Sequence, residues 1–348
     1  MKRIKIANRM IGLGYPCFIV AEAGVNHNGK FSLAKKMVDT AKKAGADAIK
    51  FQIFSAERVV TKIAQKTAYQ RKATGKGSQY EMLKKLELKE DEFRKLAAYA
   101  KRKNIIFLAS VFDENGVELL DELRVPAFKV PSGEITNFPL LKQIATKRKP
   151  IILSTGMSTL GEIAEALEVI RREGSNEIIL LHCVSDYPAK VEEMNLRAMN
   201  TLKEAFGLPV GLSDHTLNLD IPIAAAALGA KVIEKHFTLN RRLPGPDQKA
   251  SLEPDELKEM IARIREVEKA LGNGVKKPTK SEEILKEAVR RSIAARIDIP
   301  KGTVITMEML DLKRPGTGLE PRYLEKVIGR KTRIDIMADE LITFEKLA

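Results

Sequence analysis

The sequence is poor in the residues that hold small secreted folds together or bind metals through sulfur. It has only two cysteines and no tryptophan among 348 residues. Cys17 and Cys183 each lie in an apolar, strand-like run, so we expect buried thiols rather than a disulfide or a cysteine-based metal site. This pattern excludes a disulfide scaffold and requires no oxidising compartment.

Long apolar runs are also absent. Residues 1–14 are basic and contain no uninterrupted apolar segment of the signal-peptide type. No later stretch approaches the length needed to cross a bilayer. The sequence therefore predicts a soluble, cytoplasmic protein with no membrane partner.

Acidic residues are outnumbered by basic ones, which gives a formal net charge of +14. Such a charge permits nucleic-acid binding, but it suits an anionic small substrate equally well. Lysines alternate with glutamates along helical segments such as Glu253 to Leu271, a pattern typical of solvated faces. No aromatic RNA-binding motif or zinc-finger spacing is present, so we expect no nucleic-acid partner.

From Cys17 onward, short runs rich in Val, Ile and Phe alternate with longer segments of helical period. This alternation is typical of repeated βα units and a parallel sheet. The expected strands are Cys17 to Gly24, Ala48 to Phe54, Ile105 to Phe112, Ala127 to Ser132, Pro150 to Gly156, Ile178 to Val184, Val210 to His215 and Val232 to Leu239. Their number favours an α/β fold of the (β/α)8 TIM-barrel type over a doubly wound open sheet.

The composition of the chain and its predicted secondary structure change after the barrel. Residues 1–272 form the expected barrel domain, and the polar, lysine-rich residues 273–287 are expected to be a linker. Residues 288–348 contain short β-like pieces and Pro-Gly turns, which predict a small β-rich module. Within the barrel, residues 55–104 are longer than one crossover needs, so an excursion is expected before the helix Lys89 to Lys103.

Polar side chains close nearly every predicted strand. In a TIM barrel the carboxyl ends of the strands form the active face, and charged groups there would make a poor core. Period two places Lys50 with Gln52, Ser213 with His215, and Glu234 with His236 on shared faces. The polar strand ends comprise Glu22, Lys50, Gln52, Ser110, Lys129, Ser132, Glu134, Ser154, Ser185, Tyr187, Ser213, His215, Glu234 and His236.

Two of these groups point to ligands. His215 and His236 end neighbouring strands, and two imidazoles with nearby carboxylates suit a divalent metal with open positions. His182, inside an apolar run, is expected to be structural. Lys129 with Ser132, Ser154 and Ser213 supplies a cation and hydroxyls typical of a phosphate cradle. The glycine-rich loops of nucleotide-binding folds are missing.

Six motifs and a C-terminal segment now resemble the sialic acid synthase family. The segment from Arg291-Ser-Ile-Ala-Ala295 to Lys313-Arg-Pro-Gly-Thr-Gly318 is similar to its antifreeze-like, or SAF, domain. The barrel motifs are Ile19-Val-Ala-Glu-Ala-Gly-Val-Asn-His-Asn-Gly29, Ile49-Lys-Phe-Gln52, Phe128-Lys-Val-Pro-Ser-Gly-Glu134, Leu153-Ser-Thr-Gly-Met157, Gly211-Leu-Ser-Asp-His215 and Ile233-Glu-Lys-His-Phe-Thr238.

The resemblance implies condensation of phosphoenolpyruvate with N-acetylmannosamine, or with a 2,4-diacetamido-trideoxy sugar leading to legionaminic or pseudaminic acid. It implies that His215 and His236 bind Mn2+ or Mg2+, and that Glu22, Lys50 and Glu134 are catalytic. The implied phosphoenolpyruvate ligands are Lys50, Lys129, Ser132, Ser154, Ser185 and Ser213, and the implied sugar ligands are Gln52, Tyr187, Asp247 and Arg314.

The resemblance also implies a homodimer that exchanges its C-terminal domains, with Arg314 completing the partner's sugar pocket. Two departures border the sugar: Ser185 stands where some members carry Asn, and Gln248 where many bacterial members carry His. A Schiff-base aldolase using Lys50, Lys129 or Lys235 remains the alternative chemistry. A binding role for the SAF-like module alone is a further alternative.

Overall fold

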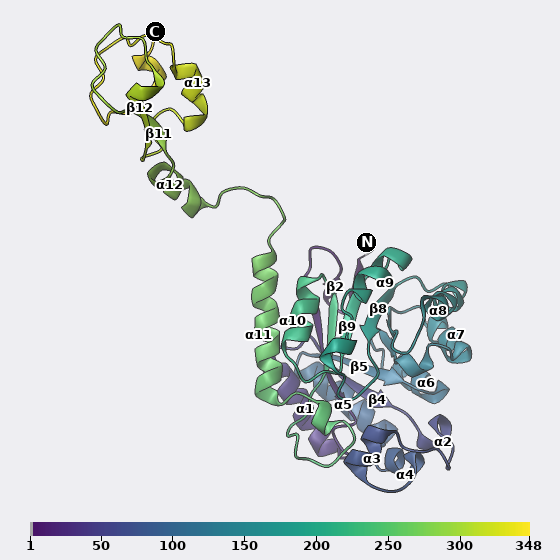
Figure 1. Ribbon diagram of the computed structural model, residues 1–348. Coiled ribbons are helices and arrows are strands. Elements are labelled where there is room, and N and C mark those ends of the chain that lie inside the picture. The colour runs from purple at the N-terminus through teal and green to yellow at the C-terminus, as the bar shows by residue number, and fades with distance from the viewer. Residues whose placement is uncertain (1–2) are drawn as a thin grey trace. The chain divides into compact units, whose positions relative to one another are not determined.

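The computed structural model describes residues 3–348. The chain divides into two compact units, one ending at Gly272 and the other comprising Asn273–Ala348. The first unit is a closed barrel of eight parallel strands surrounded by helices (Figure 1). This confirms the predicted (β/α)8 architecture and excludes the open sheet.

Each barrel strand is short and almost entirely buried. In chain order around the barrel, the strands pair with their sequence neighbours, and β10 closes the ring by pairing with β3. The strands are β3 (Phe18–Gly24), β4 (Ala48–Ile53), β5 (Ile106–Val111), β6 (Phe128–Val130), β7 (Ile151–Ser154), β8 (Ile178–Cys183), β9 (Val210–Asp214) and β10 (Val232–His236). All eight predicted strands are therefore present.

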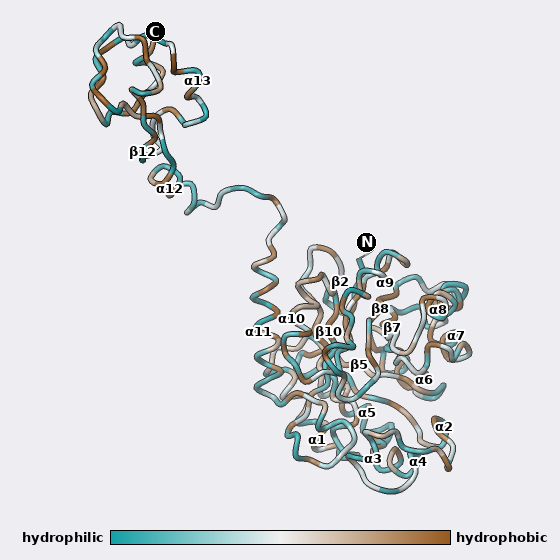
Figure 2. The backbone as a smooth tube through the Cα atoms, viewed as in Figure 1, coloured by the Kyte–Doolittle hydropathy of each residue, from teal (hydrophilic) through white to brown (hydrophobic). Residues whose placement is uncertain are grey.

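The outer layer consists of helices that each bury one apolar face. In α11, Leu257, Met260, Ile261 and Ile264 follow helical spacing, and Figure 2 shows the resulting alternation of teal and brown along this helix. The helices that follow the strands are α1 (Phe31–Ala44), α5 (Glu90–Arg102), α6 (Glu114–Glu122), α7 (Phe138–Thr146), α8 (Leu160–Arg172), α9 (Ala198–Phe206), α10 (Asp220–Ala227) and α11 (Pro254–Leu271).

The two ends of the barrel interior differ in chemistry. An N-terminal hairpin of β1 (Ile4–Ile6) and β2 (Arg9–Ile11) packs its isoleucines into one apolar cluster with the barrel residues Phe18 and Leu108. This cluster fills the amino ends of the strands with hydrocarbon. The polar strand ends are thus left at the opposite mouth, where TIM-barrel enzymes carry their chemistry.

The predicted excursion after β4 forms three short helices. They are α2 (Ala56–Val59), α3 (Ala68–Thr74) and α4 (Gln79–Lys84). Helix α4 begins with a capping box in which Ser78 and Glu81 satisfy each other's backbone N–H groups. Met82 and Leu86 pack with Val25 in a satellite cluster, which fixes the excursion next to the loop after β3.

The second unit has its own small core, formed by residues such as Ile293, Ile336 and Ile342. Its regular elements are β11 (Ser292–Ala295), β12 (Leu310–Lys313), α12 (Lys280–Val289) and α13 (Leu324–Val327). Strands β11 and β12 pair antiparallel, as expected for a β-rich module. Helix α12 begins within the segment expected to be a linker and ends beyond it, because a capping box at Thr279 and Glu282 starts a helix there.

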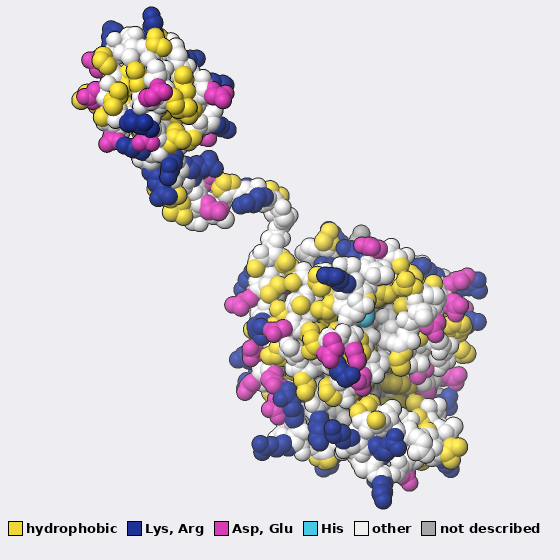
Figure 3. Space-filling view, in the orientation of Figure 1, with side chains coloured by type: hydrophobic (Ala, Val, Ile, Leu, Met, Phe, Trp, Pro, Cys, Tyr) yellow, Lys and Arg dark blue, Asp and Glu magenta, His cyan; other side chains and the backbone are white. Residues whose placement is uncertain are grey.

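The surface mixes charges of both signs. On the face seen in Figure 3, Lys and Arg side chains lie among Asp and Glu side chains over much of the barrel unit. Side chains of opposite charge form ion pairs, as Lys147 and Glu118 do at 2.7 Å. Within residues 3–348, we find no helix that combines the length and apolar character needed to span a membrane.

Candidate active site

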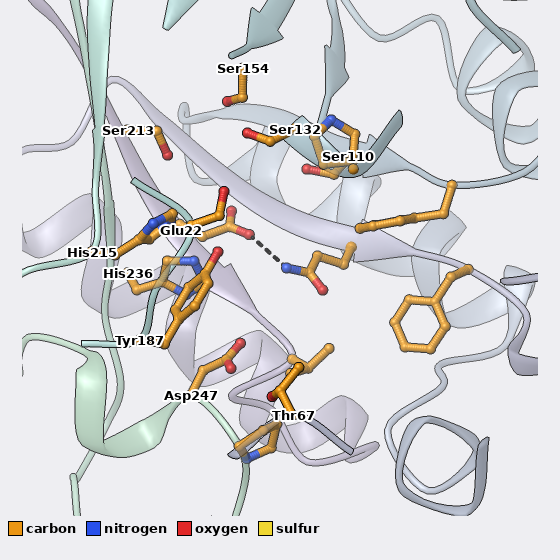
Figure 4. Close-up of a pocket in the computed structure, with 18 of the residues that line it drawn as sticks. Glu22, Thr67, Ser110, Ser132, Ser154, Tyr187, Ser213, His215, His236 and Asp247 are labelled. Atoms are coloured by element: carbon orange, nitrogen blue, oxygen red, sulfur yellow. Dashed lines mark hydrogen bonds between the residues drawn. The ribbon is translucent and has the colours of Figure 1, made fainter. Parts of the chain in front are cut away.

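A cavity of about 390 Å³ opens at the carboxyl ends of the barrel strands. Figure 4 shows side chains from several strands converging there, with the serine hydroxyls on one side and Tyr187 and Asp247 on the other. The predicted residues that line it are Glu22, Lys50, Gln52, Lys129, Ser132, Ser154, Ser185, Tyr187, Ser213, His215, His236 and Asp247. The closed barrel therefore brings together most of the residues selected from the sequence.

Lys50 is the centre of one charged group. Its ammonium lies 2.8 Å from Glu22 Oε2 and donates a hydrogen bond to Ser110 Oγ at 2.7 Å. Lys50 and Glu22 are opposite each other in the β3–β4 ladder, and all three side chains are buried. Gln52, on the same face of β4, donates to the other Glu22 oxygen at 3.4 Å. Burial raises the pKa of Glu22 despite the neighbouring Lys50 ammonium.

Lys129 is the centre of a second charged group. It donates to Ser154 Oγ at 2.8 Å and lies 3.7 Å from Glu234 Oε1. The other Glu234 oxygen is 3.7 Å from Lys50, and Ser213 donates to Glu234 at 3.0 Å. Burial lowers the pKa of Lys129, because a charged ammonium is poorly solvated there. Burial also disfavours the Glu234 carboxylate, but the two ammonium groups prevail and its pKa is lowered.

These two groups form one buried network of two cations and two carboxylates. Among the described residues that line this cavity, Lys50 and Lys129 are the only lysines, and there is no arginine. A ligand that carries negative charge can exchange places with the carboxylates as the partner of the lysines. The network is thus suited to bind a phosphate or carboxylate out of water.

The two predicted metal ligands lie side by side. The ring centroids of His215 and His236 are 5.3 Å apart, and Tyr187 lies 4.1 Å from the His215 ring. His215 Nδ1 lies 2.7 Å from the Val184 carbonyl oxygen, so Nδ1 carries the proton and Nε2 keeps a free lone pair. Burial lowers the pKa of His236 well below its usual value, which keeps that imidazole neutral. Burial also acts to lower the pKa of His215, but the neighbouring Cys183 and the Val184 carbonyl prevail and raise it. The Nδ1 atom of His236 is buried without a hydrogen-bond partner.

Neutral imidazoles with unused lone pairs are the form in which histidine binds divalent metals. Among residues 3–348, however, no cluster of three or more His, Cys, Asp or Glu side chains has the arrangement of a metal site. The pair His215 and His236 therefore fits a metal that takes its remaining ligands from water or substrate. Cys183 Sγ, 3.8 Å from His215 Nδ1, is a free buried thiol, as is Cys17. This confirms the prediction for both cysteines.

The excursion supplies a cavity wall that the sequence did not predict. Tyr69 in α3 stacks on Tyr187 with 5.2 Å between ring centroids, and Thr67, Gln70 and Gln79 line the same wall. These residues do not follow a predicted barrel strand and belong to no recognisable motif. Nothing in the sequence therefore indicated that they line the cavity. Ser110 and Glu234 also belong to the charged network, although the sequence indicated only that they close strands.

Two predicted site residues lie elsewhere. Glu134 follows β6 and accepts a hydrogen bond from Asn137 at 2.7 Å, but it is not part of the cavity lining. Burial raises the pKa of its carboxyl. Arg314 is an exposed residue of the second unit, directly after β12. Asp247 does line the cavity, and burial raises its pKa to about 6.

Three further residues make contacts that hold the fold together and do not line the cavity. Gln248 is fully buried, and its amide donates to the Asn26 carbonyl at 2.9 Å, so it is not a lining residue. Lys235, one candidate for a Schiff base, forms a buried ion pair with Asp214 at 2.5 Å and also lies outside the lining. His182 Nε2 lies 2.7 Å from the Met194 carbonyl oxygen, in agreement with its expected structural role.

Comparisons with known proteins agree with this arrangement. The profile of the NeuB family matches residues 37–276, and the SAF domain profile matches residues 290–348. A N,N'-diacetyllegionaminic acid synthase from Campylobacter jejuni is 50% identical over 93% of this chain and 98% of its own. Human N-acetylneuraminate-9-phosphate synthase is 38% identical over 97% of this chain and 94% of its own.

Solved structures show the same likeness. The sialic acid synthetase of Leptospira borgpetersenii, in complex with citrate, is 37% identical with a TM-score of 0.73. The match covers 82% of this chain and 95% of that one. The spore coat polysaccharide biosynthesis protein SpsE of Bacillus subtilis is 37% identical with a TM-score of 0.68, over 100% and 99% of the two chains. Family profile, sequence and fold thus agree, and the chain belongs to the NeuB family, with a C-terminal SAF domain.

Proposed function

We propose that the protein joins phosphoenolpyruvate to an amino-sugar aldehyde and water, giving a nine-carbon 2-keto acid and inorganic phosphate. The observation that carries this proposal is the pair of buried ammonium groups, Lys50 and Lys129, at the barrel mouth beside the imidazoles of His215 and His236. The first pair suits a small, highly charged anion, and the second suits a metal that binds an oxygen of the co-substrate. The names of the relatives support the same reaction.

Phosphoenolpyruvate would bind against the charged network. Lys129 with Ser154, and Lys50 with Ser110, offer ammonium and hydroxyl groups already held 2.7–2.8 Å apart. Gly156 N–H donates to Ser132 Oγ at 2.9 Å, which orients that hydroxyl at the start of the loop before α8. Ser185 and Ser213 would complete the contacts to the phosphate and carboxylate groups. Because these donors are in place before binding, little reorganisation is needed.

A divalent ion, Mn2+ or Mg2+, would be held by His215 and His236. When bound, it would polarise the aldehyde oxygen of the sugar as a Lewis acid. The Val184 carbonyl fixes the tautomer of His215 that this requires. Tyr187, against both rings, excludes water from one side of the pair.

The reaction balances without an external oxidant or reductant. The C2–C3 electron pair of phosphoenolpyruvate forms the bond to the aldehyde carbon, and the aldehyde oxygen takes up a proton. Water adds to C2 and loses one proton. The resulting C2 hydroxyl collapses to the ketone as the bond between C2 and the phosphate oxygen breaks, and its proton goes to the departing phosphate. Glu22, whose pKa burial raises, is placed beside Lys50 to hold or release one of these protons. Glu134, which is held by Asn137 outside the cavity lining, would orient the attacking water only after turning away from Asn137.

The acceptor sugar would lie against Gln52, Tyr187 and Asp247. N-acetylmannosamine and a 2,4-diacetamido-trideoxyhexose are both compatible with this lining. Two legionaminic acid synthases, from Campylobacter jejuni and Legionella pneumophila, are 50% and 45% identical to this chain, against 38% for the human N-acetylneuraminate-9-phosphate synthase. This difference favours the diacetamido sugar as acceptor.

Phosphate release tests the reaction and the acceptor together. Metal-stripped protein is incubated with phosphoenolpyruvate and each sugar, with and without Mn2+, and Lys129→Ala serves as the inactive control. We expect Mn2+-dependent release with the diacetamido sugar and slower release with N-acetylmannosamine. Release with neither sugar contradicts the proposal. Trapping of pyruvate on a lysine by borohydride would support the Schiff-base aldolase instead.

We further propose that Arg314 completes the sugar pocket of a partner subunit in a homodimer with exchanged C-terminal domains. Mixing two inactive variants, Lys129→Ala and Arg314→Ala, tests this exchange. A mixed dimer then contains one intact barrel that receives an intact Arg314 from its partner. We expect activity to return on mixing and re-association, whereas inactive mixed dimers would show that Arg314 acts within its own chain.

A further inference from the structure

A buried ion pair lies directly behind the two histidines. Lys235 Nζ is 2.5 Å from Asp214 Oδ2, and both side chains are fully buried. Asp214 precedes His215 and Lys235 precedes His236, and the two ion-pair residues are opposite each other in the β9–β10 ladder. Because successive side chains of a strand point to opposite faces, the ion pair and the imidazoles lie on opposite sides of the barrel wall.

The same pair binds the residue after His215. Asp214 Oδ1 accepts a hydrogen bond from the Thr216 backbone N–H at 2.9 Å, and Oδ2 accepts one from the Thr216 hydroxyl at 3.2 Å. Lys235 donates to the Thr216 carbonyl oxygen at 2.5 Å. The backbone on both sides of His215 is therefore tied to the residue that precedes His236.

The two imidazoles differ in how much their own contacts hold them. His215 has a hydrogen bond from Nδ1 to the Val184 carbonyl oxygen at 2.7 Å. His236 Nδ1 is buried without a partner, so its ring has no comparable bond at that nitrogen. The position of His236 consequently depends on the backbone of β10, which pairs with β3 and β9 and accepts a hydrogen bond from Leu252 N–H at the His236 carbonyl. Lys235 adds a side-chain ion pair between β10 and β9.

We propose that Asp214 and Lys235 are positioning residues that set the separation of His215 and His236 for a divalent metal ion. This inference rests on the metal site in the proposed function. Stability alone does not account for the pair, because a buried ion pair usually costs about as much desolvation as it returns in attraction. What an apolar pair of the same volume lacks is directional anchoring, and contacts behind a metal ligand typically change metal affinity by about 10- to 100-fold.

The test is the double variant Asp214→Asn/Lys235→Met in the full chain. It removes both charges together, so no unpaired charge is buried and the barrel is expected to fold. The control is Asp47→Asn/Arg265→Met, which removes an ion pair of 3.0 Å at the amino end of the barrel strands together with the contacts of Asp47 to Arg9 and of Arg265 to Glu268. The measurements are Mn2+ affinity, from the spin-resonance signal of free Mn2+, and thermal unfolding.

We expect Mn2+ to bind the double variant at least tenfold more weakly than wild type, with no change in the control. A folded double variant with wild-type Mn2+ affinity overturns the inference. Should this variant fail to fold, Thr216→Val decides, because it keeps both charges and loses only the hydroxyl contacts to Asp214, Lys235 and the Asn218 carbonyl oxygen. We expect it to bind Mn2+ several-fold more weakly, and wild-type affinity there overturns the inference.

The variant His236→Ala distinguishes failure of the positioning role from failure of the proposed metal site. If His236→Ala loses Mn2+ while the double variant keeps it, the positioning role alone is refuted. If His236→Ala binds Mn2+ as wild type does, the metal-ligand assignment is refuted and the positioning role falls with it.

Discussion

Glu234 holds two buried lysines with one carboxylate, which makes Glu234→Gln a sensitive test of the charged network. Its two oxygens lie 3.7 Å from Lys50 Nζ and 3.7 Å from Lys129 Nζ. Lys50 retains Glu22 at 2.8 Å after the substitution. Lys129 has no other carboxylate within ion-pair distance among the described residues, so it becomes a buried cation bonded only to Ser154 and a backbone carbonyl.

The size of the effect follows from the distances. At an effective dielectric constant of about 20, unit charges 3.7 Å apart attract by about 4.5 kcal/mol. Relaxation and water entry reduce this value, and removing one partner of a buried ion pair typically costs about 3–5 kcal/mol. Glutamine keeps the shape and an oxygen that can accept from Ser213, so the charge is the main change. We therefore expect the free energy of unfolding of the barrel to fall by about 3–5 kcal/mol.

Urea denaturation and calorimetry measure this loss, and inorganic phosphate identifies its cause. Phosphate bound near the lysines replaces part of the missing negative charge, so saturating phosphate should stabilise Glu234→Gln more than wild type. The control is Glu118→Gln, because Glu118 forms an exposed pair with Lys147 and should contribute little. A loss below about 1 kcal/mol, or equal stabilisation by phosphate, would refute the role assigned to Glu234.

Three further predictions address other parts of the site. Burial lowers the pKa of His27 from 6.5 to about 4, so the unfolded chain binds its proton first and stability should fall by about 3 kcal/mol between pH 6.5 and 4. Urea denaturation across this range should show the loss, and His27→Asn should lack it. Ser154→Ala removes the hydrogen bond from Lys129 and should raise KM for phosphoenolpyruvate about tenfold in steady-state kinetics, with less change in kcat. Tyr69→Ala removes the stack on Tyr187 and should raise KM for the sugar several-fold; an equal rise in KM for phosphoenolpyruvate would contradict its place in the sugar wall.

The barrel could be predicted because its signals are local and repeated. Each strand is a short apolar run with a polar residue at its carboxyl end, and each crossover has helical period. The wall formed by α3 and α4 could not be predicted, because nothing in the spacing of Tyr69 or Gln70 connects them to Tyr187. Their contact depends on how the excursion folds back over the mouth, and a satellite cluster around Met82 decides this through packing distant in sequence.

Successive side chains of a strand point to opposite faces, and this alternation explains which parts of the charged network could be predicted and which could not. The alternation places Glu234 and His236 on the inner face of β10 and Lys235 on the outer face. Lys235 therefore lies outside the cavity lining, although both of its neighbours in sequence line the cavity. The alternation does not determine which lysine pairs with Glu234, because Lys50 lies on β4 and Lys129 on β6, across the barrel from β10. Only closure of the ring brings these strands within reach of one another, so the shared partner of the two lysines follows from the closed barrel and not from any single strand.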